Sequence, residues 1–174
     1  IMDRGAIGVL AAGVLACGFA LGRASIAARR SPDPAGATDA DVEDEVTENI
    51  VVVEPTGTSH EVTIILLPGF TGSAENLLPW FRRLEEFGVN LDKAKILATT
   101  APKRRITCYD GWRANAWFDY IDEQFDKEDM IDTAQMLQSR RALTKIVDAE
   151  VELLGDPQKV LLLGFSQGGN MAYE

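Results

Sequence analysis

Residues 159–174, KVLLLGFSQGGNMAYE, constrain the fold of this chain more than any other stretch. Four apolar residues precede Gly164, which is typical of a strand buried on both faces of a parallel sheet. Residues 164–168 then match Gly-x-Ser-x-Gly, the pattern of a strand that turns sharply into a helix and presents a serine at the turn. We therefore expect a sheet strand, a strained turn at Ser166 and a helix directly after it.

The same pattern indicates nucleophilic chemistry at Ser166. The glycines on either side leave room for the turn, so the serine Oγ stands clear of the sheet. The helix that follows directs its N-terminal amides toward that oxygen and favours a developing anion there. We interpret Ser166 as a nucleophile; the alternative is a glycine-bearing turn with an incidental serine.

An oxyanion hole needs two amide donors. The first expected donor is the backbone N–H of Gln167, so replacing its side chain with alanine should cost much less than the loss of a donor. The second donor is expected in the glycine-bearing loop at 66–73, LLPGFTGS, with the Phe70 amide as the candidate. An ordinary glycine turn is the alternative reading of this loop.

Strand and helix patterns alternate along the rest of the chain, which predicts an α/β fold with a doubly wound, mostly parallel sheet. The expected strands cover 49–55, 61–68, 95–102 and 159–164, the expected helices cover 75–88 and 129–154, and residues 103–127 are expected to be irregular and rich in aromatic residues.

Two segments of unusual composition precede the expected folded domain at 49–174. Residues 5–22 carry no charge over 18 positions and lie in a segment, 1–30, that we expect to be a membrane anchor or a cleaved signal or transit segment; a soluble tail is the third alternative. An anchor would make membrane contact through residues 5–22, and the arginines after it would place the domain on the cytoplasmic side. A cleaved segment would indicate a secretory or organellar protein. Residues 31–48 hold seven acidic residues and no basic one, which predicts a disordered acidic linker.

Composition excludes several classes of function. The net charge of −10 argues against nucleic acid as a partner. The two cysteines, Cys17 and Cys108, are too few and too far apart for a metal site or a disulfide framework.

Four segments, in order, resemble the acyl-protein thioesterase/carboxylesterase branch of the α/β-hydrolases, the phospholipase/carboxylesterase family. They are IILLPGFTGS at 64–73, ATTAPKRRIT at 98–107, NAWFDY at 115–120 and LLLGFSQGGNMA at 161–172. The resemblance implies an α/β-hydrolase fold and a serine hydrolase that cleaves acyl esters or thioesters through an acyl-enzyme on Ser166. It implies no cofactor and no metal. The implied substrates are small acyl esters or thioesters, among them a lipidated protein or a lysophospholipid.

The aromatic segment around 117–118 allows two roles. Trp117 and Phe118 are expected either to line a substrate-binding acyl groove or to pack in the core beneath a long loop. Asp119 is expected to be structural, because in this family the triad acid follows the nucleophile.

The chain departs from the family pattern in two places. Pro68 stands where the family has a histidine, and no Asp or His follows Ser166 among residues 167–174. The chain's one histidine, His60, lies far upstream of the serine and is expected to be a loop residue. Because triads in this fold run in the order Ser, Asp or Glu, His, we expect the chain to be a fragment whose acid and base lie beyond it. The alternative to a fragment is a catalytically dead form. For the function, the alternatives are another α/β-hydrolase, such as a lipase or peptidase, and a non-catalytic membrane-tethered interaction protein.

Overall fold

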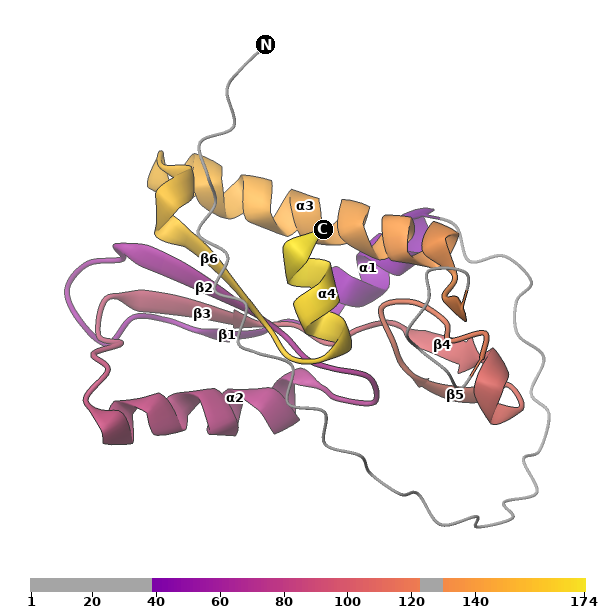
Figure 1. The fold of residues 1–174 in the computed structure, drawn as a ribbon. Coiled ribbons are helices and arrows are strands. Elements are labelled where there is room, and N and C mark those ends of the chain that lie inside the picture. The colour runs from indigo at the N-terminus through magenta and orange to yellow at the C-terminus, as the bar shows by residue number, and fades with distance from the viewer. Residues whose placement is uncertain (1–38, 123–129) are drawn as a thin grey trace.

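The computed structural model describes residues 39–122 and 130–174, and its ribbon shows a sheet with helices on both faces (Figure 1). The sheet strands are β1 (Val51–Val53), β2 (Val62–Leu67), β3 (Ala94–Ala98) and β6 (Val160–Gly164), and a separate hairpin pairs β4 (Lys103–Ile106) with β5 (Trp112–Asn115). The helices are α1 (Asp39–Glu48), α2 (Ala74–Arg82), α3 (Thr133–Leu154) and α4 (Gln167–Tyr173), and the short 3-10 turns are η1 (Arg83–Phe87), η2 (Thr107–Tyr109) and η4 (Pro157–Lys159).

The order of strands in the sheet is β1-β3-β2-β6. Strand β2 runs parallel to both β3 and β6, whereas β1 pairs antiparallel with β3. At the carboxyl end of the β2–β6 ladder, Leu67 pairs with Gly164. The loops that leave β2 and β6 therefore emerge side by side, at the edge where α/β sheets bind ligands.

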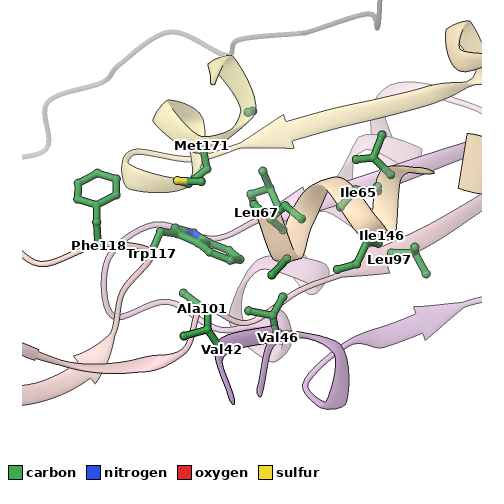
Figure 2. Close-up of a cluster of buried hydrophobic side chains, with 14 of the residues drawn as sticks. Val42, Val46, Ile65, Leu67, Leu97, Ala101, Trp117, Phe118, Ile146 and Met171 are labelled. Atoms are coloured by element: carbon green, nitrogen blue, oxygen red, sulfur yellow. The ribbon is translucent and has the colours of Figure 1, made fainter. Parts of the chain in front are cut away.

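Alternate residues of each parallel strand pack against opposite layers. In β2, Ile65 and Leu67 join a core under α1, α3 and α4, whereas Ile64 and Leu66 join a second core under α2. Figure 2 shows the first of these cores, with Trp117 lying beside Leu67 and with Met171 entering from α4. Burial on both faces explains why the sequence of β2 is a continuous apolar run.

The doubly wound α/β architecture predicted from the sequence is confirmed. Helix α3 begins after Asp132, whose carboxylate accepts a hydrogen bond from the Gln135 N–H, and ends at Gly155 in the left-handed conformation. The helix expected over 75–88 is divided into α2 and the 3-10 turn η1, and it ends at the left-handed Gly88 as expected.

The structure differs from the disordered linker expected over 31–48, because residues 39–48 form helix α1. The acidic composition conceals an apolar stripe in which Val42 and Val46, four residues apart, are almost completely buried against α3. On the solvent side Glu43 pairs with Lys145 of α3. The folded unit therefore includes residues 39–48 as well as the expected domain from residue 49.

The region 103–127 also differs from the irregular structure expected, because β4 and β5 form a hairpin in it. Arg104 and Ile106 of β4 are buried while Lys103 is exposed, so the strand alternates in burial although three of its four residues are basic. A basic strand with a buried arginine does not show the apolar alternation by which strands are recognised.

The segment 5–22, predicted to be an anchor or a signal, lies outside the described residues. Across 39–122 and 130–174, the helices are all too short or too polar to span a bilayer.

Candidate active site

Ser166 lies at the turn from β6 into α4, as the sequence predicted. Its backbone dihedrals are φ 50° and ψ −119°, a combination that non-glycine residues rarely adopt. The turn is closed by hydrogen bonds from the Gly168 N–H to the Phe165 carbonyl and from the Gly169 N–H to the Ser166 carbonyl. Such strain persists only where the surrounding structure holds it, and it is concentrated at functional sites.

Two glycines of the elbow are required by close backbone packing. A Cβ at Gly164 would lie 2.1 Å from the Gly168 carbonyl oxygen, and a Cβ at Gly168 would lie 2.1 Å from the Leu67 carbonyl oxygen. No side chain fits at either position. The motif therefore records how closely α4 approaches both its own strand and the neighbouring β2.

The loop after β2 lies directly against the nucleophile. A Cβ built on Gly69 would be 3.1 Å from the Ser166 Cβ and 3.1 Å from the Phe165 carbonyl oxygen. The Phe165 N–H donates to the Leu67 carbonyl at 2.9 Å, which fixes the two strand ends before their loops diverge. The structure thus brings the 66–73 loop and the elbow together, as the sequence analysis expected.

Gln167 is the first residue of α4, so its backbone N–H has no partner within the helix. In the loop after β2, Thr71 is left-handed and donates its N–H to the Asn115 carbonyl, and Gly72 donates to the Gly69 carbonyl. Among the described residues, the Phe70 N–H makes no hydrogen bond. Both amides assigned to the oxyanion hole therefore lie on the two turns that flank Ser166.

The side chain of Phe70 packs into an aromatic cluster formed by the β4–β5 hairpin and the segment that follows it. Its ring stacks on Tyr109 with centroids 5.8 Å apart and meets Tyr120 edge-on at 5.5 Å and Trp112 edge-on at 6.3 Å. These contacts hold the loop by its side chain while its backbone remains close to Ser166.

The Gln167 side chain has a role that sequence reasoning missed, so the expectation that Gln167→Ala would cost little is wrong. It is buried, its Oε1 accepts a hydrogen bond from the Trp117 N–H at 2.8 Å, and its Nε2 donates to the Phe118 carbonyl at 2.8 Å. The partners are separated from it by 49 and 50 residues, so no local pattern could reveal them. The co-occurrence of the two family motifs was the available signal.

Trp117 and Phe118, expected to line an acyl groove or to pack in the core, are both fully buried in the first core. The Trp117 indole N–H donates to the Pro68 carbonyl at 2.8 Å, at the start of the candidate oxyanion loop. Phe118 borders a hollow of about 370 Å³ between the beginning of α3 and the end of α4. Contact of either side chain with substrate stays a prediction.

A buried arginine, Arg104, fixes the backbone of residues 116–117 through hydrogen bonds. Arg104 donates to the Ala116 carbonyl at 3.2 Å and to the Ser139 Oγ at 3.2 Å, and that hydroxyl donates to the Trp117 carbonyl at 2.5 Å. Burial lowers the pKa of the Arg104 guanidinium, although the nearby carboxylate of Asp132 opposes the shift.

Asp119 and His60 occupy structural positions. The Asp119 carboxylate accepts from the Thr107 N–H at 2.7 Å and from the Thr107 hydroxyl. His60 bonds to Thr63 at the amino end of β2, whereas Ser166 follows the carboxyl end of β6. A strand of six residues, roughly 20 Å in length, therefore separates His60 from the nucleophile. Among residues 39–122 and 130–174 no cluster of three or more metal-binding side chains occurs.

Comparison with known families matches residues 48–174 to the phospholipase/carboxylesterase family. Lysophospholipase-like protein 1 of Mus musculus is 30% identical over 121 residues, which are 70% of this chain and 49% of that protein. Acyl-protein thioesterase 1 of Gibberella zeae is 28% identical over 128 residues, or 70% of this chain and 52% of that protein. The crystal structure of acyl-protein thioesterase 2 of Zea mays aligns with a TM-score of 0.53 and 29% identity, covering 71% of this chain and 48% of that one. This chain spans about half the length of the curated relatives it matches.

Proposed function

This chain belongs to the phospholipase/carboxylesterase family of α/β-hydrolases, and we propose that it carries the nucleophile and oxyanion hole of a serine hydrolase of acyl esters and thioesters. The observation that carries the proposal is the strained Ser166 at φ 50°, packed against the 66–73 loop. A serine held at positive φ at the end of a buried strand costs free energy, and such strain is concentrated at functional sites.

In the proposed reaction, the Ser166 Oγ attacks the acyl carbonyl carbon while a histidine base takes the serine proton. The backbone N–H groups of Gln167 and Phe70 stabilise the negative charge that forms on the carbonyl oxygen. Collapse of the tetrahedral intermediate expels an alcohol or a thiol, which receives the proton from the base. Water then attacks the acyl-enzyme by the same route and releases the carboxylic acid.

The base and its carboxylate partner are proposed to lie in sequence that follows residue 174. In this fold both come after the nucleophile, and the chain spans about half of its curated relatives. His60 is engaged at the opposite end of the sheet and is not proposed as the base.

The names of the relatives point to acyl thioesters and lysophospholipids as substrate classes. We propose that Trp117 and Phe118 line the buried side of the acyl-binding region. We also propose that residues 5–22 are a membrane anchor that leaves the domain on the cytoplasmic side.

The test is labelling and turnover in the complete protein. A fluorophosphonate probe should label the wild-type protein at Ser166 and should not label Ser166→Ala, and a short-chain p-nitrophenyl ester should be hydrolysed by the wild type alone. The 174-residue chain without a triad base should show no measurable turnover. Hydrolysis by the 174-residue chain that Ser166→Ala abolishes would contradict the proposed position of the base.

A lipase or peptidase on the same fold would differ in its acyl-chain-length profile and its leaving group. A non-catalytic membrane-tethered interaction protein would show neither labelling nor turnover.

A further inference from the structure

We propose that residues 115–118 are a positioning brace that sets the spacing between the two halves of the oxyanion hole, with the Trp117 indole and the Gln167 carboxamide as its two attachment points. This inference rests on the proposed function, because the brace acts by aligning amides that belong to two different loops. Neither side chain needs to touch the substrate.

On one side the brace holds the loop that carries Phe70. The Trp117 indole N–H donates to the Pro68 carbonyl at 2.8 Å, and the Asn115 carbonyl accepts from the Thr71 N–H at 2.8 Å. The Asn115 Nδ2 also donates to the Gly72 carbonyl at 3.1 Å. Three hydrogen bonds from residues two positions apart thus fix the loop on both sides of the Phe70 amide.

On the other side the brace holds the elbow. The Gln167 carboxamide bonds to the backbone of both Trp117 and Phe118. Gln167 is also the residue whose own backbone N–H is the first proposed donor. The backbone of Gln167 therefore supplies one proposed donor, and its side chain connects that donor, through residues 115–118, to the loop that carries the other.

The sheet alone does not fix this spacing. The β2–β6 ladder ends at Leu67 and Gly164, and the last backbone bond between the two strand ends joins Phe165 to Leu67. Beyond that point the two loops are held together by the close packing of Gly69 and Gly168 and by the brace. The indole is fully buried and rigid, so it transmits the position of one loop to the other.

Trp117→Phe in the complete protein tests the proposal, because phenylalanine retains an aromatic ring and loses the N–H that bonds to Pro68. The matched control is Trp80→Phe, the same substitution at a side chain that is 72% exposed on α2. The measurements are kcat and KM on a short-chain p-nitrophenyl ester, inhibition by a trifluoromethyl ketone that forms a tetrahedral oxyanion, and urea unfolding.

We expect Trp117→Phe to lower kcat roughly tenfold and to weaken the trifluoromethyl ketone by a similar factor, because small misplacement of an oxyanion donor affects the transition state. KM should change less than twofold. A purely structural role would lower the unfolding midpoint and leave kcat of the folded enzyme unchanged. A kcat within twofold of the wild type, in a folded Trp117→Phe protein, overturns the proposal.

A second variant keeps the test decisive if Trp117→Phe fails to fold. Asn115→Ala removes only the side-chain bond to the Gly72 carbonyl, and we expect it to lower kcat roughly threefold without a change in KM. An unchanged kcat in this variant likewise overturns the brace. The wild-type protein separates the two proposals, because absence of its turnover and of Ser166 labelling refutes the proposed function itself.

Discussion

The two ends of the sheet are stabilised differently. Charged side chains connect the amino ends of β2 and β3, whereas close backbone packing and neutral amide hydrogen bonds connect the carboxyl ends of β2 and β6. The buried Glu150 of α3 accepts from the Thr63 hydroxyl at 2.8 Å and from the Lys95 Nζ at 2.5 Å. Because the Thr63 proton goes to Glu150, the His60 Nε2 must donate to the Thr63 oxygen, 2.8 Å away. Thr63 and Lys95 are paired in register, so this ionic network lies across one end of the sheet.

The carboxyl ends show the opposite arrangement. Glycine contacts, the strained Ser166 and the Gln167 carboxamide hold the loops there. The backbone N–H groups of Gln167 and Phe70 are the ones proposed to bind a substrate oxygen. The difference indicates that the amino ends of the strands contribute to stability and the carboxyl ends to catalysis. Substitutions at the amino ends should change stability and leave turnover unaltered, whereas substitutions at the carboxyl ends should change turnover more than stability.

The largest expected effect is that of Ser166→Ala in the complete protein. It removes the attacking oxygen, and we expect kcat/KM on an acyl ester to fall by about 10⁴-fold or more. The unfolding midpoint in urea should stay at the wild-type value or rise slightly, because Ser166 is exposed. A large loss of stability would contradict the comparison between the two ends of the sheet, because Ser166 would then be needed for folding as well as for catalysis.

The next effect in size concerns the second donor. Phe70→Pro deletes the amide and should lower kcat about a hundredfold, the usual consequence of losing one oxyanion donor. Phe70→Ala is the control, because it keeps the amide and loses only the ring contacts with Tyr109, Trp112 and Tyr120. Circular dichroism confirms that each variant folds. Equal kcat values in the two folded variants would remove Phe70 from the oxyanion hole and leave the 66–73 loop a plain turn.

At the amino ends, Thr63→Val keeps the volume of the side chain and removes the hydroxyl between His60 and Glu150. We expect a loss of about 1–2 kcal/mol in the free energy of unfolding, because a buried carboxylate loses a donor. Thr144→Val, at an exposed threonine of α3, is the matched control. Turnover per folded molecule should not change in either variant. A drop in kcat for Thr63→Val alone would show that the two ends of the sheet are coupled.

The two ends also differ in how much of them could be predicted from the sequence. The elbow is local: a strand, two glycines and Ser166 lie within a few positions, so pattern and sterics suffice. The Gln167 side chain, the Trp117 indole and the Thr63–Glu150 bond join residues between 49 and 87 positions apart, and no periodicity records such a pairing. Helix α1 was missed for a different reason, because acidic residues on its outer face outweighed two buried valines in the composition.

The smallest expected effect is a dependence of stability on alkaline pH at the carboxyl ends. Burial raises the pKa of Tyr120 to about 12, although a hydrogen bond from the Gln167 side chain opposes the shift. The protonated phenol is the neutral form, so the unfolded chain ionises near pH 10 while the folded protein does not. The stability that Tyr120 contributes is therefore complete below pH 10 and is lost progressively as the pH rises from 10 toward 12.

At pH 10.5 this loss amounts to about 0.8 kcal/mol for a shift of that size. Tyr120→Phe has no phenol proton to lose. Between pH 8 and pH 10.5, the wild type should therefore lose about 0.8 kcal/mol more of its free energy of unfolding than Tyr120→Phe does. Urea unfolding at the two pH values measures the difference, and Tyr173→Phe, at a tyrosine that is 82% exposed, is the matched control. If the wild type and Tyr120→Phe lose the same stability over this interval, Tyr120 ionises in the folded protein as readily as in the unfolded chain. The burial of Tyr120 would then not favour its neutral form, and the neutral character assigned to this end of the sheet would be wrong.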